Sequence, residues 1–416
     1  MSTTNTSAGM VIVGAGHCGG RAALCLRQQG WMGEITLIGD EQYLPYERPA
    51  LSKSLLCGDG TFEALHLATQ EGWQEANVTL RLGIAVAKLD RRRQVVELKD
   101  GSEVPYQCLL LATGGTARRL SFQLQDSPRI HSLRSYADML RLQPLLSHGK
   151  KVVIIGGGFI GLEIAATACE LGCTVTVVEG ASRLLSRAVP ATVAERVAQL
   201  HMGNGIVLSL GCYPEEVKDH GTGVAVTLQN GCRFDADLVV VGVGMQPRTE
   251  LAQAAGLKVD LGIVVDDQLR TSDPKIFAAG DACEFPSRLS KSPTRQETWY
   301  NAESQAALVA SNMLGKRLAY QDTPWFWSDQ FEHTLQVCGE PALAVHTATR
   351  YLENDGIIQF HTNEMHQLIG FSGFGRQNLM GRDLKVARKL VERSVVLALK
   401  DLADASVPLK KWLSAH

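Results

Sequence analysis

A glycine-rich turn directly after a short apolar run constrains the fold of this chain more than any other feature. Residues 10–13 are predicted as a strand, Gly14-Ala-Gly-His-Cys-Gly19 as the turn and residues 21–29 as a helix. In this pattern the first glycine permits the tight turn, the second lets the backbone approach a pyrophosphate, and the third lets helix and strand pack closely. The phosphates would face the helix N-terminus. The spacing therefore predicts a Rossmann-type dinucleotide-binding unit.

An acidic pair at the end of the next apolar run supports this interpretation. Residues 35–38 are predicted as a strand, and Asp40 and Glu41 follow about 20 residues beyond the last glycine of the turn. An acid at this place would accept hydrogen bonds from a ribose. We predict that the first dinucleotide is bound by Gly14, Gly16, Cys18, Gly19, Asp40 and Glu41.

The same pattern recurs in the middle of the chain. Residues 151–155 are predicted as a strand, Gly156-Gly-Gly-Phe-Ile-Gly161 as the turn, residues 162–171 as a helix and residues 174–178 as the next strand. Two such motifs imply two dinucleotides, and the commonest pairing that performs chemistry is a tightly held flavin beside a diffusible nicotinamide. We therefore predict FAD in the first unit and NAD(H) in the second. The predicted NAD residues are Gly156, Gly158, Phe159, Ile160, Gly161, Glu163, Glu179, Gly242 and Gly244.

Glu179, which closes the second unit, favours NADH over NADPH. A carboxylate accepts hydrogen bonds from the ribose 2′- and 3′-hydroxyls but repels a 2′-phosphate at the same place. Arg183, four residues further on, is an alternative partner for a 2′-phosphate, although we favour its interpretation as a solvent-facing side chain. The sequence therefore predicts NADH.

Composition sets broad limits. A length of 416 residues predicts two or three domains, and a formal charge of -2 gives no reason to expect a nucleic acid or an anionic membrane as partner. Ten cysteines without a C-x-x-C pair argue against a redox dithiol or a zinc site, and we expect no metal. The polar start and the absence of an apolar run of roughly 18 residues favour the cytoplasm. The run Arg91-Arg-Arg93 is interpreted as a solvated turn.

Further strings of the sequence resemble a known family in the same order along the chain. They are Pro45-Tyr-Glu-Arg-Pro-Ala-Leu-Ser-Lys53, Leu109-Leu-Leu-Ala-Thr-Gly-Gly115, Ile276-Phe-Ala-Ala-Gly-Asp281, Glu297-Thr-Trp-Tyr-Asn-Ala302 and Pro324-Trp-Phe-Trp-Ser-Asp-Gln330. Together with the two glycine motifs, they resemble the FAD-dependent ferredoxin reductases of bacterial aromatic-ring dioxygenase and cytochrome P450 systems. That family shares the α/β fold of glutathione reductase, with two Rossmann-like domains and a C-terminal α+β domain.

The resemblance implies a domain layout. Residues 1–117 and 249–323 would form a discontinuous FAD domain around an NAD domain of residues 118–248. Residues 324–416 would form the C-terminal domain. Its predicted elements are strands at 342–347, 356–360 and 367–371 and a helix at about 381–400.

The resemblance also implies roles for single residues. Trp299 would present a backbone N–H to the flavin, and Asp281 would accept hydrogen bonds from the ribityl chain. Lys53 matches a lysine beside the flavin N5 and O4 edge and could pair with Glu163; we take this pair as the catalytic hypothesis, with a purely structural salt bridge as the alternative. Trp327 either lies near the flavin edge or packs in the core. Further residues that match positions near FAD are Arg48, Val86, Ala112, Thr113, Gly114 and Arg134.

The implied activity is NADH-dependent ferredoxin reduction. FAD would accept hydride from NADH and pass single electrons to a [2Fe-2S] or Rieske-type ferredoxin. Candidate basic docking residues are Lys291 and Arg295, whereas the pairs Lys316-Arg317 and Lys410-Lys411 could equally be solvated surface residues.

Three alternatives stay open. Rubredoxin could replace ferredoxin as the acceptor. An NADH oxidase, a peroxidase or a CoA-disulfide reductase would use a single cysteine near the flavin, and Cys57 lies about one helical turn beyond that place. A protein resembling apoptosis-inducing factor would bind NADH in order to signal.

Overall fold

The computed structural model describes residues 8–120 and 127–415, and the chain divides into two compact units. Unit 1 contains the chain up to Arg48, residues 61–116 and residues 246–322. Unit 2 contains residues 49–60, residues 117–245 and the chain from Thr323 onwards. The chain therefore leaves and re-enters unit 1, as a discontinuous first domain requires. The division of unit 2 into an NAD domain and a C-terminal domain stays a prediction.

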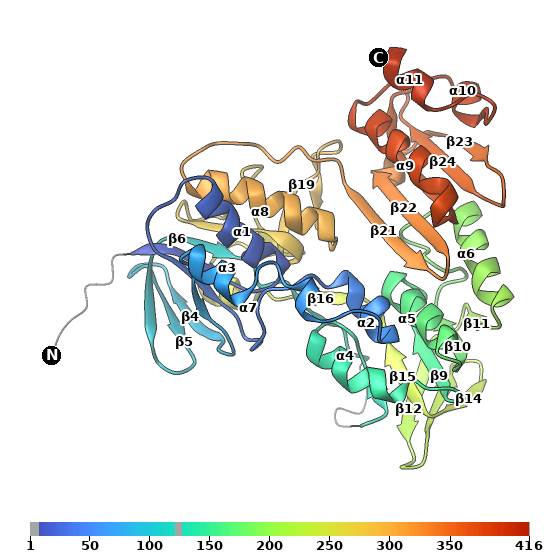
Figure 1. Ribbon diagram of the computed structural model, residues 1–416, viewed down its shortest axis with the longest axis horizontal. Helices are drawn as coiled ribbons and strands as arrows, with labels where there is room; N and C mark the ends of the chain where they lie inside the picture. Colours follow the sequence, from blue (N-terminus) through green and yellow to red (C-terminus); the bar gives the residue numbers. More distant parts are fainter. Residues whose placement is uncertain (1–7, 121–126, 416) are drawn as a thin grey trace. The chain divides into compact units, whose positions relative to one another are not determined.

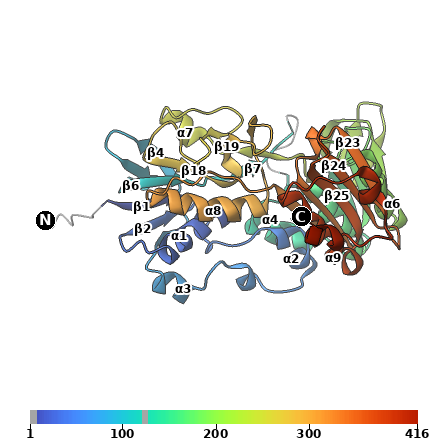
Figure 2. The same ribbon diagram turned by 90° about the horizontal axis from the view of Figure 1, so that it is seen from above.

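Unit 1 is built around a sheet with the order β3-β2-β1-β6-β5-β4, in which β18 also pairs with β6. β1 (Gly9–Val13) is buried at all five positions, as expected for a central strand with parallel neighbours and both faces covered. Helices α1 (His17–Gln28) and α8 (Trp299–Met313) lie side by side (Figures 1 and 2). The other strands of this sheet are β2 (Ile35–Ile38), β3 (Thr79–Arg81), β4 (Val86–Asp90), β5 (Val95–Leu98), β6 (Glu103–Leu111) and β18 (Ile276–Ala278).

Unit 1 also contains several smaller helices and strands. They are α3 (Gln70–Glu75), α7 (Glu250–Ala254), β17 (Ile263–Val264), β19 (Cys283–Pro286) and β20 (Pro293–Thr294). Two short strands, β7 (Gly115–Ala117) and β16 (Met245–Pro247), lie where the chain passes from one unit to the other.

In unit 2, a parallel sheet with the order β11-β10-β9-β15-β8 carries the second glycine motif. The motif leads from β9 (Lys151–Ile155) into α5 (Phe159–Glu170), and β10 (Thr174–Glu179) follows. The remaining elements around this sheet are α2 (Ser54–Cys57), β8 (Ile130–His131), α4 (Tyr136–Leu142), α6 (Ala191–Gly203), β11 (Val207–Leu210), β12 (Pro214–Asp219), β13 (Val224–Leu228), β14 (Arg233–Ala236) and β15 (Leu238–Val241).

The predicted strands of both glycine motifs are confirmed, but both helices begin earlier than predicted. α1 begins at His17 instead of Arg21, and α5 begins at Phe159 instead of Leu162. In each case the second glycine of the motif is the N-cap, so the third glycine lies in the first helical turn. Because glycine has a low helix propensity, the residue types alone do not indicate that the helix begins before it.

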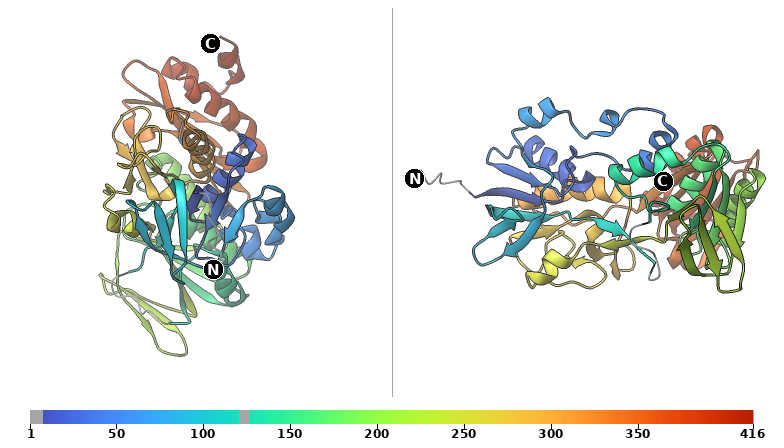
Figure 3. Two further views of the ribbon diagram at one scale, coloured as in Figure 1. Left: turned by 90° about the vertical axis from the view of Figure 1, so that its left-hand side faces the viewer. Right: turned by 90° about the horizontal axis from the view of Figure 1, so that it is seen from below.

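The C-terminal segment of unit 2 forms an antiparallel sheet with the order β21-β22-β25-β24-β23, against which α9 (Gln377–Glu392) lies (Figures 1 and 3). The strands are β21 (Trp325–Gln330), β22 (His333–Gly339), β23 (His346–Tyr351), β24 (Ile357–Thr362) and β25 (Leu368–Arg376), and α10 (Leu399–Ala403) and α11 (Lys410–Ala415) end the chain. The sequence did not predict β21 or β22. The two later predicted strands are confirmed, although β25 runs five residues beyond the predicted end at residue 371.

Two predicted boundaries in this segment are wrong. The strand predicted at 342–347 is a single helical turn at Pro341–Leu343 followed by β23, because a proline favours the first position of a helical turn. The helix predicted to reach residue 400 ends at Glu392. There Ser394 adopts a φ of 49°, its N–H donates to Val391 O, and the N–H of Val395 donates to Leu390 O. This is a Schellman ending with serine at the position that glycine usually occupies, so no glycine marks the end of the helix.

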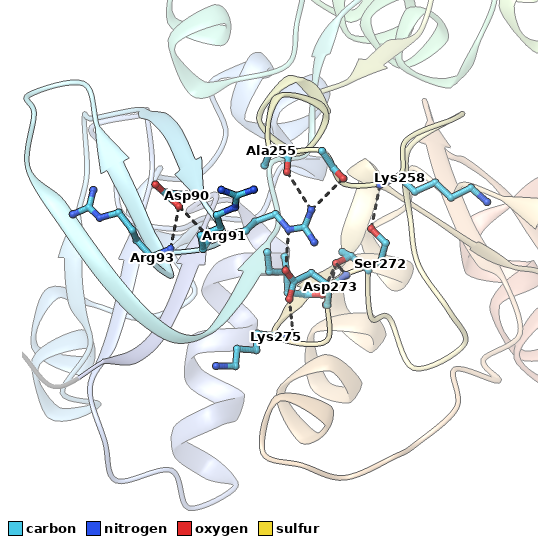
Figure 4. Close-up of polar contacts among 12 residues, drawn as sticks. Asp90, Arg91, Arg93, Ala255, Lys258, Ser272, Asp273 and Lys275 are labelled. Carbon is cyan, nitrogen blue, oxygen red and sulfur yellow. Dashed lines mark hydrogen bonds and ion pairs between the residues drawn. The ribbon is translucent and has the colours of Figure 1, made fainter.

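The interpretation of the arginine run as a solvated turn is wrong for Arg91, whose side chain bonds to other segments (Figure 4). Its Nε donates to Asp273 Oδ2 at 2.8 Å, and its Nη1 donates to the carbonyl oxygens of Ala255 and Gly256. Arg92 and Arg93 are exposed, as predicted. Arg91 thus attaches the turn between β4 and β5 to the segment after α7 and to the turn that precedes β18.

All ten cysteines are free thiols, and seven of them are buried, which confirms that most act as small apolar residues. Among the described residues, no three histidine, cysteine or acidic side chains gather as metal ligands would. Nor does any helix in that part of the chain have the length and apolar character needed to cross a bilayer.

We expect His361, in β24, to make stability depend on pH. Its side chain is buried beside Ser372, and burial lowers its pKa to about 4. Below about pH 6.5 the unfolded chain binds a proton that the folded chain does not, so stability present above that pH is lost as the pH falls toward 4. Between pH 7.5 and pH 5 this loss amounts to about 2 kcal/mol. Urea-induced unfolding of the wild type and of His361→Gln at both pH values measures it, and an unchanged pH dependence in the variant would contradict this origin.

Candidate functional site

The glycines of the first motif divide into two kinds. Gly14 has a φ of 113°, and a Cβ on it would lie 2.1 Å from Ala112 O; a Cβ on Gly19 would lie 1.9 Å from Gly14 O. The chain itself therefore requires these two glycines. Gly16 has ordinary extended angles, and the nearest protein atom to a Cβ there is Arg48 Nη2, 3.7 Å away. Neither the backbone nor the packing requires glycine at this position, whereas the close approach of a pyrophosphate would.

The second motif repeats this division. Gly156 has a φ of 115°, and its Cβ would lie 2.4 Å from Gly242 O; a Cβ on Gly161 would lie 2.1 Å from Gly156 O. Gly158 has a φ of −86°, and no atom lies within 4 Å of its Cβ position. Gly16 and Gly158 are thus equivalent open positions, each at the N-terminus of a 12-residue helix. Both cradles fit a bound diphosphate.

Glu179 is held in place by backbone N–H groups. Its Oε2 accepts from Gly157 N and its Oε1 from Ala181 N, both at 2.7 Å. The carboxylate is therefore fixed at the end of β10, beside the open position at Gly158. Arg183 is half-buried, contrary to the prediction that it faces solvent, and its guanidinium donates to the carbonyl oxygens of Val189 and Ser186, both at 2.8 Å. Because the guanidinium is engaged there, the geometry favours a ribose hydroxyl over a 2′-phosphate as the partner of this site.

The acidic pair after β2 is also engaged in ion pairs. Arg48 Nη2 donates to Glu41 Oε1 at 2.7 Å, and Tyr46 Oη donates to Glu41 Oε2 at 2.7 Å. Asp40 pairs with Arg248 Nη1 at 2.7 Å. Arg48 therefore lies between Glu41 and the open position at Gly16, where a guanidinium suits a phosphate. Arg248 was not among the predicted residues, because nothing in the sequence links it to a residue 208 positions earlier.

The other predicted FAD residues have the following places. Cys18 is buried in α1, where burial raises the pKa of its thiol; its part in binding FAD stays a prediction. Ala112, Thr113 and Gly114 follow β6, Val86 opens β4, and Asp281 lies in a short helical turn before β19. Trp299 is the first residue of α8, and its indole meets the ring of His17 edge-on at 5.2 Å. These residues all belong to unit 1, whereas Arg134 and Lys53 belong to unit 2.

The second unit also contains a buried ion pair. Lys53 Nζ lies 2.9 Å from Glu163 Oε1, and the Glu163 side chain is only 4% exposed. Two hydroxyls donate further hydrogen bonds to this carboxylate: Ser52 donates to Oε2 at 2.5 Å and Ser328 to Oε1 at 2.7 Å. A buried charge is tolerated when it is paired and hydrogen-bonded in this way. The sequence predicted the two charged residues but not the two serines, although both serines lie in the strings that carried the family resemblance.

Strand β21 presents different chemistry on its two faces. Phe326, Ser328 and Gln330 share the face toward α5 and α6, where Phe326 meets the ring of Phe159 at 4.8 Å. Trp325 and Trp327 lie on the other face, stacked at 5.1 Å. Trp327 is half-buried. Its place near the flavin edge stays a prediction.

Cys57 does not have the environment of a reactive thiol. It ends α2, is half-buried, and burial raises its pKa, as do the nearby Glu170 and Asp59. Reactive cysteines have a lowered pKa in positive surroundings. We therefore expect Cys57→Ser to leave NADH-dependent reduction of ferricyanide within about twofold of wild type. If the rate fell more than tenfold with the flavin content unchanged, Cys57 would be the reactive thiol of the oxidase, peroxidase or CoA-disulfide reductase alternative.

Comparison with known sequences decides the family. The model for the pyridine nucleotide-disulphide oxidoreductase family matches residues 9–306, and the model for the reductase C-terminal domain matches residues 325–413. The chain belongs to this family. The predicted α/β fold class is thereby confirmed.

Relatives of this pyridine nucleotide-disulphide oxidoreductase match it along nearly its whole length. The ferredoxin–NAD(+) reductase component of an anthranilate 1,2-dioxygenase system from Burkholderia cepacia is 39% identical over 409 residues, 97% of this chain and 98% of that one. Putidaredoxin reductase from Pseudomonas putida is 39% identical over 432 residues, 99% and 98% of the two chains. A chain of the covalent putidaredoxin reductase–putidaredoxin complex superimposes with a TM-score of 0.92 at 34% identity and 99% coverage of both chains. These matches confirm the resemblance to ferredoxin reductases.

Proposed function

We propose that this chain is an FAD-containing reductase that takes hydride from NADH and delivers electrons to a [2Fe-2S] ferredoxin serving an oxygenase. The observation that supports this most strongly is the pair of open glycine positions, Gly16 and Gly158, each the second glycine of a dinucleotide-binding motif at a helix N-terminus, where a pyrophosphate would approach the backbone. Relatives named as ferredoxin–NAD(+) reductases match nearly the whole chain. When bound, FAD would accept a hydride and release the electrons singly, as a [2Fe-2S] centre requires.

The residues of unit 1 would bind FAD. The N-terminus of α1 and Arg48 would hold the pyrophosphate, and the acidic pair Asp40 and Glu41 would meet the ribose. Asp281 would accept from the ribityl chain. The N-terminus of α8 at Trp299 would place backbone N–H groups and positive dipole against the flavin edge where negative charge develops on reduction.

The residues of unit 2 would bind NADH. Gly158 and the N-terminus of α5 would accept the pyrophosphate, and Glu179 would select the unphosphorylated ribose. The Lys53–Glu163 pair would act at the nicotinamide end. There Lys53 would stabilise the charge that arrives with the hydride, and Glu163 would fix the ammonium group in place.

The proposed partner is a small acidic ferredoxin docked through weak, charge-steered contacts. Lys291 and the pairs Lys316-Arg317 and Lys410-Lys411 are exposed and fit this role. Arg295 fits it less well, because its guanidinium lies 2.6 Å from Glu297. Ten free thiols suit a reducing compartment, and we propose the cytoplasm.

Steady-state assays with added acceptors test this function. The purified protein should be yellow, should reduce ferricyanide with NADH, and should reduce cytochrome c only when a [2Fe-2S] ferredoxin is added. Faster reduction with rubredoxin would change the assigned acceptor. Efficient NADH oxidation by oxygen alone would indicate an oxidase, and NADH binding without turnover would indicate a signalling protein. A protein that stays colourless after reconstitution with FAD would overturn the proposal.

A further inference from the structure

A chain of buried hydrogen bonds connects the Lys53–Glu163 pair to helix α6. Ser328 donates to Glu163, Gln330 Nε2 donates to Ser328 Oγ at 3.1 Å, and His201 Nε2 lies 2.8 Å from Gln330 Oε1. Ser328, Gln330 and His201 are at most 1% exposed. Their elements are far apart in sequence but all belong to unit 2. Three buried polar side chains in a row need a reason, because each costs free energy unless it is fully paired.

The chemistry of each group fixes the direction of the chain. An ionised Glu163 can only accept, so the single hydroxyl proton of Ser328 is donated to it. The oxygen of Ser328 must then accept from the amide nitrogen of Gln330, which turns the amide oxygen toward His201. His201 Nε2 must therefore carry a proton. Burial lowers the pKa of His201, which favours the neutral ring, so Nδ1 carries none.

The surroundings of Nδ1 agree with this assignment. Nδ1 of His201 is buried and has no hydrogen-bond partner among the described residues. If the hydrogen bonds ran in the opposite direction, the buried carboxylate of Glu163 would lose the hydrogen bond from Ser328. That loss costs more than leaving one buried acceptor, Nδ1 of His201, without a partner.

We propose that His201 is a positioning residue for hydride transfer. Its Nε2–H tautomer orients Gln330, Gln330 keeps Ser328 donating to Glu163, and Glu163 in turn holds Lys53. This inference rests on the proposed function of the Lys53–Glu163 pair. It adds a residue that does not touch the pair but hydrogen-bonds Gln330, and that no motif of the sequence indicates.

Loss of the His201 donor has a definite consequence. Without it, the amide of Gln330 can rotate and present its oxygen to Ser328, whose hydroxyl then turns away from Glu163. The carboxylate would lose one of its two hydroxyl donors and with it the fixed position of Oε1, the atom that contacts Lys53. Small displacements of a positioning group slow reactions strongly.

Three variants of the FAD-loaded protein separate this role from mere packing. His201→Leu removes the donor, His201→Gln can place an amide N–H near the position of Nε2, and His361→Leu removes an equally buried histidine that hydrogen-bonds Ser372 instead. We expect the limiting rate of flavin reduction by NADH, measured by stopped flow, to fall roughly tenfold in His201→Leu, equivalent to about 1.4 kcal/mol. His201→Gln should lie within about threefold of wild type, and His361→Leu should equal it. A wild-type rate in His201→Leu, or no recovery in His201→Gln, would overturn the inference.

A direct measurement keeps the inference testable even if His201→Leu does not fold. The ¹⁵N chemical shifts of the His201 ring in the wild-type protein report the tautomer, and we expect neutral Nε2–H. An Nδ1–H tautomer or a protonated ring near pH 7.5 would overturn the assigned direction of the chain. Failure of the proposed function looks different, because the wild-type flavin would then not be reduced by NADH at all.

Discussion

Replacing Gly158 by alanine is expected to lower kcat/KM for NADH by roughly 10- to 100-fold without destabilising the protein or reducing its flavin content. No protein atom lies within 4 Å of the Cβ position, and the φ of −86° suits any residue, so the added methyl group costs nothing in the folded chain. It would occupy the space that the pyrophosphate of NADH needs, and overpacking of this kind costs roughly 1–3 kcal/mol. Steady-state kinetics with NADH and ferricyanide measure the loss.

Gly203→Ala is the matched control, because Gly203 is also in unit 2, also at a helix end, and also has nothing within 4 Å of its Cβ position. It should leave kcat/KM unchanged. Gly16→Ala is the reciprocal variant, and we expect it to weaken retention of FAD. If Gly158→Ala binds and uses NADH as well as the wild type does, the second cradle is not a pyrophosphate site.

The strand, turn and helix of each glycine motif could be predicted from the sequence for a physical reason. The tight approaches of Gly19 to Gly14 and of Gly161 to Gly156, and the open positions at Gly16 and Gly158, are local requirements of one turn each, so a short string of residues records them. The predicted helix starts lie three or four residues after the observed ones, at His17 and Phe159, because a glycine in the first turn weakens the local helix signal.

What the sequence missed depends on contacts between distant segments. Arg248 reaches Asp40 across 208 positions, Ser328 reaches Glu163 across 165, and His201 reaches Gln330 across 129. None of these pairs has a spacing that a helix or a strand period would reveal. The end of α9 at Glu392 was missed for a different reason, because a serine fills the left-handed position that glycine usually marks.

Replacing Lys53 by methionine should slow the reduction of flavin by NADH by roughly 100-fold while leaving the flavin bound. Methionine keeps much of the length and apolar volume of lysine but removes the ammonium group that lies 2.9 Å from Glu163. The proposed stabilisation of the charge that arrives with the hydride would be lost, and removing one electrostatic contact of this kind costs 10²- to 10³-fold in comparable enzymes. Stopped-flow measurement at saturating NADH isolates this step from the reaction with ferredoxin.

A double variant distinguishes this catalytic role of Lys53 from the purely structural alternative. Removing one partner of a buried pair leaves Glu163 uncompensated, which costs roughly 3–5 kcal/mol of stability whether or not Lys53 takes part in the reaction. The double variant Lys53→Met with Glu163→Gln removes that buried charge and should recover most of the stability, because the amide of glutamine can still bond to Ser52 and Ser328. If the double variant also recovers the rate of flavin reduction, Lys53 serves the fold alone. If stability returns while the rate stays low, the ammonium group itself acts in hydride transfer.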